Sequence, residues 1–375
     1  MRILLIPDKF KGSLTAQEVI FAISQGIRLS RPQAKIRSLL ASDGGDGFLQ
    51  AVAHNSTCME IEVDSVDPLG REIRAPYIIG KDGVQAYIEM AQTSGLELLK
   101  PHERQTGETS TLGTGVQLKH ALGQGVREIY LGLGGSATTD GGIGIAHALG
   151  FRFLDAKNDV LEPLGKNLGY IAHIAMDTLI RNPKEVAIYA VNDVDNPLYG
   201  PNGAAYVYGP QKGANDSELS LLDQGLRNLD RVVQDVLGKK VAQVPGSGAA
   251  GGTAYGLKAF LGADYVPGID FILGLSNIKT QIRERAFDLI ITGEGKLDHQ
   301  TLHGKLIKGV TDLGRENAIP VVVVCGQCTL TEEEKNALGL QAILEIRDYG
   351  KPLEYSLQNA APLIREAVRK FMGDF

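Results

Sequence analysis

The stretch Gly134-Gly135-Ser136-Ala137-Thr138-Thr139-Asp140-Gly141-Gly142 combines four glycines, three hydroxyl side chains and one carboxylate. It lies between a strand-like run, EIYLGL at 128–133, and a helix-like run, IGIAHALGF at 143–151. Successive backbone N–H groups in such a turn form a concave anion site, and the following helix N-terminus adds partial positive charge. The stretch therefore predicts a phosphate or carboxylate site, formed by Gly134, Gly135, Ser136, Thr138, Thr139 and Asp140. The alternative is a long turn in which Asp140 only caps the helix.

Length and composition indicate a globular enzyme of two domains. A chain of 375 residues is long for one hydrophobic core. A net charge of −6, with no block of basic residues, argues against nucleic acid or an anionic membrane as the main partner. Three cysteines form no closed set of disulfides, and no apolar run reaches membrane-spanning length. We expect a cytoplasmic protein whose partners are small molecules.

The two ends of the chain share one pattern, in which apolar strands alternate with amphipathic helices. Strands are expected at 2–7 and 36–40, and again at 286–292, 320–325 and 341–346. Thr15 and Glu18 fit a capping box at the start of the first helix. Residues 57–89 instead alternate apolar with polar residues, which predicts antiparallel strands. The pattern predicts an α/β fold: a parallel-sheet domain from residues 1–66 and 264–375, with a mixed α/β domain, 67–263, inserted.

DKFKGS at 8–13 directly follows the first expected strand. Open α/β sheets place ligands at the carboxyl ends of their strands. Lys9 and Lys11 have the charge to neutralise a phosphate or carboxylate, with Asp8 and Ser13 beside them. A solvated turn in which Ser13 caps the helix is the alternative.

SDGGDG at 42–47 presents two carboxylates on a flexible backbone. Asp43 and Asp46 are hard oxygen ligands of the kind that Mg²⁺ prefers, and they also fit the hydroxyls of a polyol. Gly44 and Gly45 allow a ligand to approach closely. The alternative is helix capping by Asp43 and helix-dipole complementarity from Asp46.

Three later loops carry similar chemistry. NDVDNPL at 192–198 holds Asp193 and Asp195, either of which can serve as a general base or metal ligand. GSGAAGGT at 246–253 reads as a flexible phosphate loop through Gly248 and Gly251. GEGKLD at 293–298 offers Glu294 and Asp298 for magnesium or a ribose, Lys296 or Lys305 to reach a phosphate, and Gly293 and Gly295 as substrate- or phosphate-binding positions. Turns and charged surface loops are the alternatives.

These loops match the requirements of phosphoryl transfer. That reaction needs positioned phosphates, a magnesium ion, cations and a base for the attacking hydroxyl. Hydride transfer fits less well, because the GxGxxG at 246–251 follows a proline and lacks an acidic ribose partner.

Seven stretches also resemble, in order, the type-1 glycerate kinases: PDKFKGSLTA, SDGGDG, DPLGR, GGSATTDGGIG, DVDNPL, GSGAAGG and TGEGKLD. The resemblance covers nearly the whole chain. It implies ATP-dependent phosphorylation of D-glycerate to 2-phosphoglycerate, with 3-phosphoglycerate as the alternative product. It also implies a Rossmann-like or flavodoxin-like domain from both termini, an inserted domain and an active site in the cleft between them.

The resemblance suggests roles for individual residues. Lys9, Lys11 and Ser13 would hold the glycerate carboxylate or the transferred phosphoryl group. Ser136, Thr138 and the amides of Gly134 and Gly135 would hold phosphate. Asp193 would be the base, and Asp43, Glu294 or Asp298 would bind Mg²⁺. An oxidoreductase acting on a small hydroxy acid and a non-catalytic glycerate-binding protein remain as alternative functions.

Overall fold

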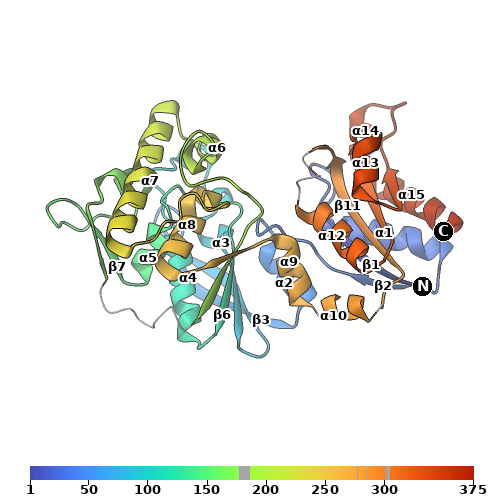
Figure 1. Cartoon of the computed structure of the whole chain (residues 1–375), viewed down its shortest axis with the longest axis horizontal. Helices are drawn as coiled ribbons and strands as arrows, with labels where there is room; N and C mark the ends of the chain where they lie inside the picture. Colours follow the sequence, from blue (N-terminus) through green and yellow to red (C-terminus); the bar gives the residue numbers. More distant parts are fainter. Residues whose placement is uncertain (177–185, 277, 285, 300, 302–304) are drawn as a thin grey trace. The chain divides into compact units, whose positions relative to one another are not determined.

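The protein divides into two compact units. The computed structural model describes residues 1–375 except 177–185, 277, 285, 300 and 302–304. Unit 1 comprises Met1–Ser42 and Gly268–Phe375, and unit 2 comprises Asp43–Pro267. Each unit has its own sheet and its own hydrophobic core, and each is described by itself (Figure 1).

Unit 1 is built on a parallel sheet with the strand order β13-β12-β11-β1-β2. The strands β1 and β11 are neighbours in the sheet. Beyond β11 lie β12 and then β13, and on the opposite side, beyond β1, lies β2. The topological switch point of the sheet therefore lies between β1 and β11, where open α/β sheets bind their ligands. The strands are β1 (Arg2–Pro7), β2 (Lys35–Ser38), β11 (Leu289–Leu297), β12 (Val321–Cys328) and β13 (Ala342–Glu345).

Helices cover both faces of this sheet. On one face, α1 (Ala16–Ser30) and α15 (Ala360–Asp374) pack on alternate strand residues such as Ile3 and Leu5. On the other, α12 (Lys305–Glu316) and α13 (Glu332–Leu338) pack against Val323 and Cys325. The predicted capping box of Thr15 and Glu18 is confirmed at the start of α1. The remaining helices are α9 (Gly268–Leu275), α10 (Ile278–Arg283) and α14 (Leu353–Gln358).

Unit 2 is built on a mixed sheet with the strand order β10-β9-β6-β5-β4-β3. The pairs β3–β4 and β4–β5 are antiparallel, as predicted for residues 57–89, and the other pairs are parallel. The strands are β3 (Cys58–Val66), β4 (Glu72–Gly80), β5 (Gln85–Glu89), β6 (Glu128–Gly132), β9 (Ala187–Val191) and β10 (Asp264–Val266). A separate antiparallel pair is formed by β7 (Phe151–Leu154) and β8 (His173–Met176).

Several helices and short helical turns complete unit 2. They are α2 (Phe48–Asn55), α3 (Ala91–Ser94), α4 (Leu112–Gly123), α5 (Ile143–Ala148), α6 (Ala204–Tyr208), the 3-10 turn η5 (Pro210–Lys212), α7 (Asp216–Leu237) and α8 (Ala249–Leu261). Side chains from α4, α5, α7 and α8 join those of the central strands in one core. The α/β fold, with a parallel domain from both termini and a mixed domain inserted, is therefore confirmed.

Two details of the prediction are wrong. Residues 43–66 belong to unit 2, because β3 pairs with β4 along its whole length and α2 packs on β4 and β5. Residues 264–267 also belong there, because β10 pairs with β9.

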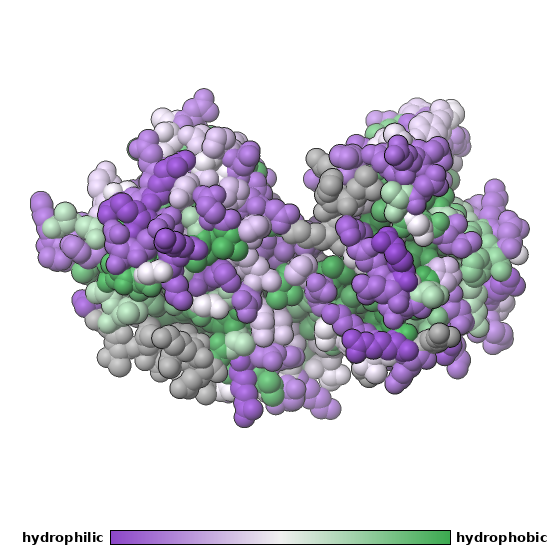
Figure 2. All heavy atoms as spheres, viewed as in Figure 1, coloured by the Kyte–Doolittle hydropathy of each residue, from purple (hydrophilic) through white to green (hydrophobic). Residues whose placement is uncertain are grey.

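The face shown in Figure 2 is largely hydrophilic, with hydrophobic residues in scattered patches. Within the described ranges, every helix is too short or too polar to cross a membrane.

Candidate active site

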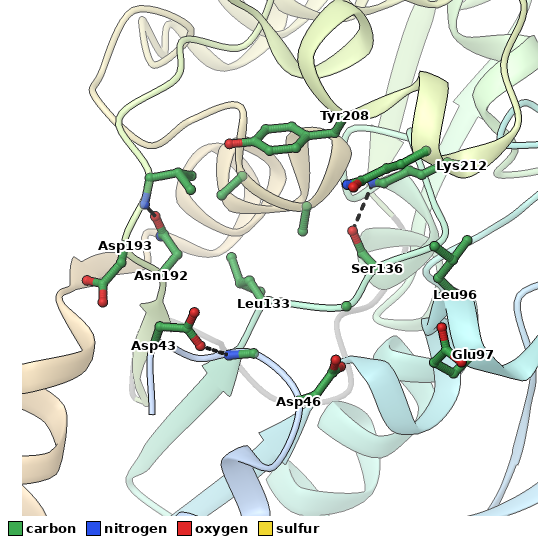
Figure 3. Close-up of a pocket in the computed structure, with 17 residues that line it drawn as sticks. Asp43, Asp46, Leu96, Glu97, Leu133, Ser136, Asn192, Asp193, Tyr208 and Lys212 are labelled. Carbon is green, nitrogen blue, oxygen red and sulfur yellow. Dashed lines mark hydrogen bonds between the residues drawn. The ribbon is translucent and has the colours of Figure 1, made fainter. Parts of the chain in front are cut away.

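A pocket of about 340 Å³ lies within unit 2, and several predicted loops line it. The loops 43–46, 133–136 and 192–194 contribute most of its wall, and residues 249 and 250 contribute another part (Figure 3). The second and third loops follow β6 and β9, which are neighbouring parallel strands. Their carboxyl ends therefore meet at one edge of the sheet, as ligand sites of α/β sheets require.

The loop at 43–46 packs directly on the loop at 133–136. The Gly134 amide donates to the Gly44 carbonyl at 2.8 Å, and a Cβ on Gly134 would lie 2.2 Å from Gly45 Cα. Glycine is thus required for the two backbones to meet. The Asp43 carboxylate accepts from the Gly45 amide at 2.8 Å, so its direction is set by its own turn. Asp43 and Asp46 both line the pocket.

Glu89, which the sequence analysis missed, fixes the end of this loop through hydrogen bonds. Its carboxylate accepts from the Gly47 and Leu49 amides at the start of α2, at 3.2 and 2.9 Å. Burial raises the pKa of Glu89 above its usual value, while the backbone hydrogen bonds oppose that rise. The feature of the sequence that could have indicated Glu89 is the position of an acidic residue at the end of an apolar strand. The helix cap expected from Asp43 is supplied by this distant residue.

The stretch 134–142, with which the sequence analysis began, has two parts: its first residues line the pocket, and the following ones are buried. Gly134, Gly135 and Ser136 line the pocket, whereas Thr138, Thr139 and Asp140 are fully buried. Thr139 Oγ1 accepts from Thr106 at 2.9 Å. Thr138 Oγ1 is buried without a hydrogen-bond partner in the described structure.

Asp140 joins two helix starts instead of facing a ligand. Its carboxylate accepts from the amide and hydroxyl of Thr111, both at 2.8 Å, and from the Gly142 and Gly144 amides at 3.0 and 3.3 Å. Desolvation raises the pKa of Asp140, although these four hydrogen bonds oppose the shift. The capping alternative therefore describes this residue, and it also ties α4 to α5.

Lys212 is a second residue that the sequence analysis missed. It ends η5, is 2% exposed, and lines the pocket beside Ser136. Its Nζ donates to Ser136 Oγ at 2.9 Å and to the Thr138 carbonyl at 2.7 Å (Figure 3). Burial lowers the pKa of Lys212 to about 7. Nothing in the motif pattern marked it, because QKG at 211–213 reads as an ordinary polar turn.

Asp193 lies at the other end of the pocket. Figure 3 shows it near Asp43, with Ser136 and Lys212 on the opposite side. Its neighbour Asn192 accepts from the Val194 amide at 3.4 Å, and the buried Asn192 Nδ2 has no partner in the described structure. Asp195 is exposed and does not line the pocket.

The loop at 246–253 contributes Ala249 and Ala250 to the pocket wall, while its predicted glycines pack on neighbouring backbone. Ala250, Gly251 and Gly252 adopt left-handed φ values of 54°, 65° and 86° near the start of α8. A Cβ on Gly251 would lie 2.0 Å from the Thr138 carbonyl, and one on Gly248 would lie 2.3 Å from the Pro197 carbonyl. Neither predicted glycine lines the pocket, because each faces a neighbouring backbone.

Unit 1 brings two other predicted loops together at its switch point. The Asp8 amide donates to the Gly293 carbonyl at 2.9 Å, and a Cβ on Gly295 would lie 3.2 Å from the Lys11 amide nitrogen. A cavity of about 90 Å³ lies here, between these loops and the segment 346–360. Lys11 and Lys296 contribute to its wall.

Acidic and hydroxyl groups at this edge already have protein partners. Ser13 Oγ donates to the Leu357 carbonyl at 2.5 Å, and Lys296 pairs with Asp298 at 2.9 Å. Burial and the nearby charges of Asp8 and Asp298 raise the pKa of Glu294 to about 7. Lys305 begins α12, and its side chain lies outside the described part of the chain.

The predicted residues thus fall into two groups. In unit 2, the structure brings together Asp43, Gly45, Asp46, Gly134, Gly135, Ser136 and Asp193, with Gly44 packed behind them. In unit 1, it gathers Asp8, Lys9, Lys11, Ser13, Gly293, Glu294, Gly295 and Asp298 around the ends of β1 and β11. Their union in one cleft between the units stays a prediction.

Metal binding also remains a prediction. Among the residues that the structure describes, no group of three or more His, Cys, Asp and Glu side chains is arranged to hold a metal ion.

Comparison with known proteins decides the family. The sequence profile of the glycerate kinase family matches residues 3–375. The chain belongs to the glycerate kinase family. A glycerate kinase of Halalkalibacterium halodurans is 38% identical, over 98% of this chain and 96% of its own. A glycerate 2-kinase of Escherichia coli is 37% identical, over 92% of this chain and 90% of its own.

A solved structure agrees with this assignment. The crystal structure of a protein described as glycerate kinase 2 from Salmonella typhimurium LT2 superposes with a TM-score of 0.85. It is 36% identical and covers 100% of this chain and 98% of its own. The similarity to glycerate kinases thus extends over both units of the chain.

Proposed function

We propose that this member of the glycerate kinase family transfers the γ-phosphoryl group of ATP to the 2-hydroxyl of D-glycerate. The observation that carries the proposal is the family match over residues 3–375. The choice of the 2-hydroxyl is supported by the relative from Escherichia coli, which is named glycerate 2-kinase. The oxidoreductase and the non-catalytic binding protein gain no support from these relatives.

Asp193 is the proposed general base. Phosphoryl transfer to an alcohol requires that the hydroxyl lose its proton as it attacks. Asp193 lines the pocket on the loop after β9, at the carboxyl end of the sheet. Its carboxylate would accept that proton and orient the hydroxyl toward the phosphoryl group.

Magnesium fits the chemistry of the acidic end of this pocket. Mg²⁺ is usually bound by one or two carboxylates together with water and substrate phosphates. Asp43 and Asp46 supply such hard oxygen donors, so we assign them as its protein ligands. The ion would neutralise charge on the phosphates of ATP. Glu294 and Asp298 lie in unit 1 and are not among the acids that line this pocket, and Asp298 is paired with Lys296.

The nucleotide is assigned to unit 1. Its parallel sheet has its switch point between β1 and β11, and the cations Lys9 and Lys11 follow β1 directly. Loops at such a point bind phosphates through backbone amides and cationic side chains. We therefore assign Lys9 and Lys11 to the phosphates of ATP, including the transferred one.

A coupled assay for ADP release with D-glycerate and Mg-ATP tests the proposal. Turnover is expected with D-glycerate but not with 3-hydroxypropionate, which lacks the 2-hydroxyl. Phosphorus NMR of the product is expected to show 2-phosphoglycerate, and 3-phosphoglycerate would contradict the assigned position. Absence of ADP release with D-glycerate would contradict the function itself, and reduction of NAD(P)⁺ by D-glycerate, without ATP and without coupling enzymes, would indicate the oxidoreductase.

A further inference from the structure

Lys212 is the one cationic side chain among the described residues that line the unit 2 pocket. Four carboxylates line the same pocket: Asp43, Asp46, Glu97 and Asp193. An anion that enters such an acidic pocket needs an opposite charge close by, because like charges repel most strongly where water is scarce. Lys212 is therefore positioned to decide where an anionic group of the substrate binds.

The Lys212 side chain is held in place and gains a free donor when it is protonated. Its two hydrogen bonds, to Ser136 Oγ and the Thr138 carbonyl, use both N–H groups of the neutral amine, and a proton taken up at Nζ supplies the third donor of the ammonium group. Ser136 lies in the pocket wall, so the lysine approaches the pocket through this hydroxyl (Figure 3). The site is thus built from a buried charge and a hydroxyl, and not from a mobile surface lysine.

A further donor lies at the other end of the pocket, beside Asp193 (Figure 3). The amide nitrogen of Asn192 is buried and has no partner in the described structure, although its oxygen is used by Val194. A buried donor without a partner costs about 1–3 kcal/mol, so such groups commonly mark ligand contacts. Asn192 lines the pocket, where a substrate oxygen would satisfy it.

The charges around Lys212 make its protonation sensitive to an incoming anion. Asp140 is the acidic group that acts on it, and burial outweighs that attraction, lowering the pKa of Lys212 to about 7. Arg104, whose backbone packs on Gly213, directs its guanidinium to Glu97 at 3.8 Å. Tyr208 donates its hydroxyl to Asn196.

We infer that Lys212 binds the carboxylate of D-glycerate beside Ser136, and that a proton is taken up at its Nζ when this carboxylate binds. The inference rests on the proposed function and adds that the Lys212 side chain recognises the carboxylate of D-glycerate. One ammonium matches the single charge of a carboxylate, whereas the triphosphate of ATP carries several charges. The step is a proton transfer from solvent to the neutral amine, and no covalent bond changes.

Lys212→Met tests the ligand, with Lys157→Met as the matched control. Lys157 is exposed on unit 2 and outside the pocket. A hydrogen bond to a charged group contributes about 1.5–3 kcal/mol, so the KM for D-glycerate is expected to rise roughly 10- to 100-fold in Lys212→Met. The KM of Lys212→Met for ATP is expected to stay near the wild-type value. The KM values of Lys157→Met for D-glycerate and for ATP are also expected to stay near wild type. A rise confined to the KM for ATP would overturn the inference in favour of a nucleotide phosphate.

A neutral substrate separates recognition from a merely structural role. D-glyceramide keeps both hydroxyls of glycerate but lacks the negative charge. Wild type is expected to prefer D-glycerate in kcat/KM, and Lys212→Met is expected to lose most of that preference. A variant that is only less stable would lose activity toward both compounds and keep their ratio, which would overturn the inference.

Proton uptake tests the same point without a variant, should Lys212→Met fail to fold. Calorimetry of D-glycerate binding to wild type, in buffers of different ionisation enthalpy, counts the protons taken up. Burial lowers the pKa of Lys212 to about 7 and a bound carboxylate would raise it, so proton uptake is expected to be clearly larger at pH 8 than at pH 6. Uptake near zero at both values would overturn the inference.

The two proposals fail in different ways. A wild-type protein without ADP release on D-glycerate contradicts the proposed function. An active wild type whose KM for D-glycerate is unchanged by Lys212→Met contradicts this inference alone.

Discussion

At the scale of single residues, the role proposed for Asp193 as general base can be tested by one substitution. Asp193→Asn keeps the size of the side chain but removes its capacity to accept a proton. We expect kcat to fall about 10²- to 10⁴-fold, the usual contribution of a general base. The free energy of unfolding should change little, because Asp193 is only half-buried. Steady-state kinetics with D-glycerate and Mg-ATP measure the effect.

The neighbouring Asp195 supplies the control for that variant. It lies two residues away, is exposed and does not line the pocket, so Asp195→Asn is expected to keep nearly full activity. A near-normal kcat in Asp193→Asn would remove Asp193 as the base.

For Asp140 we expect a loss of stability, in contrast to Asp193, because the Asp140 carboxylate accepts hydrogen bonds from buried backbone amides. Asp140→Ala would leave the buried amides of Thr111, Gly142 and Gly144 without their acceptor. Unpaired buried donors cost about 1–3 kcal/mol each before relaxation, so we expect a loss of at least about 3 kcal/mol in the free energy of unfolding. Urea denaturation followed by circular dichroism measures it. Asp46→Ala, at an exposed position, should cost less than about 1 kcal/mol, and equal losses would contradict the assigned role.

At the scale of elements, the start of α8 and the loop at 134–142 form one packed pair of backbones. Gly251 has a φ of 65°, and a Cβ there would lie 2.0 Å from the Thr138 carbonyl. Gly251→Ala therefore combines backbone strain with a steric clash, and we expect a loss of more than about 2 kcal/mol in stability. The displaced Thr138 carbonyl is also an acceptor of Lys212, so the KM for D-glycerate should rise.

Gly262 provides a matched control for this substitution. It caps the other end of α8 with a φ of 74°, but nothing lies within 4 Å of the position of its missing Cβ. Gly262→Ala should show only the left-handed strain, about 1–2 kcal/mol, in chemical denaturation. Equal costs for the two variants would show that the contact between the loops contributes nothing.

At the scale of the whole molecule, the two units have separate cores. Among the described residues, the buried core of unit 2 is formed by side chains between Tyr77 and Ala263, all of which belong to unit 2. We expect residues 43–267, produced alone, to fold and to unfold cooperatively in urea, because their sheet is complete. Residues 268–375 alone should not fold, because β1 and β2 are missing from their sheet. A non-cooperative transition for 43–267 would contradict this independence.

The sequence alone determined most of the elements and the outline of the fold. Buried strands and amphipathic helices leave periodic patterns in the chain, so β1, β11, β12 and α1 could be predicted from their own residues. The capping box of Thr15 and Glu18 was visible for the same reason, since its partners are three residues apart. The boundary near residue 42 was not visible, because strand pairing assigns β3 to unit 2.

For the site, the sequence alone determined the loops that end strands, and hence Asp43, Ser136 and Asp193. Tertiary structure decided what each loop residue does. It buried Asp140 between two helix starts, and it brought Lys212 to Ser136 from 76 residues further along the chain. Local patterns report interactions between neighbours in sequence, whereas the charge and direction of a buried group depend on partners that only folding brings near. The proposed recognition of the substrate's carboxylate therefore depends on the folded pocket, and no sequence motif indicates it.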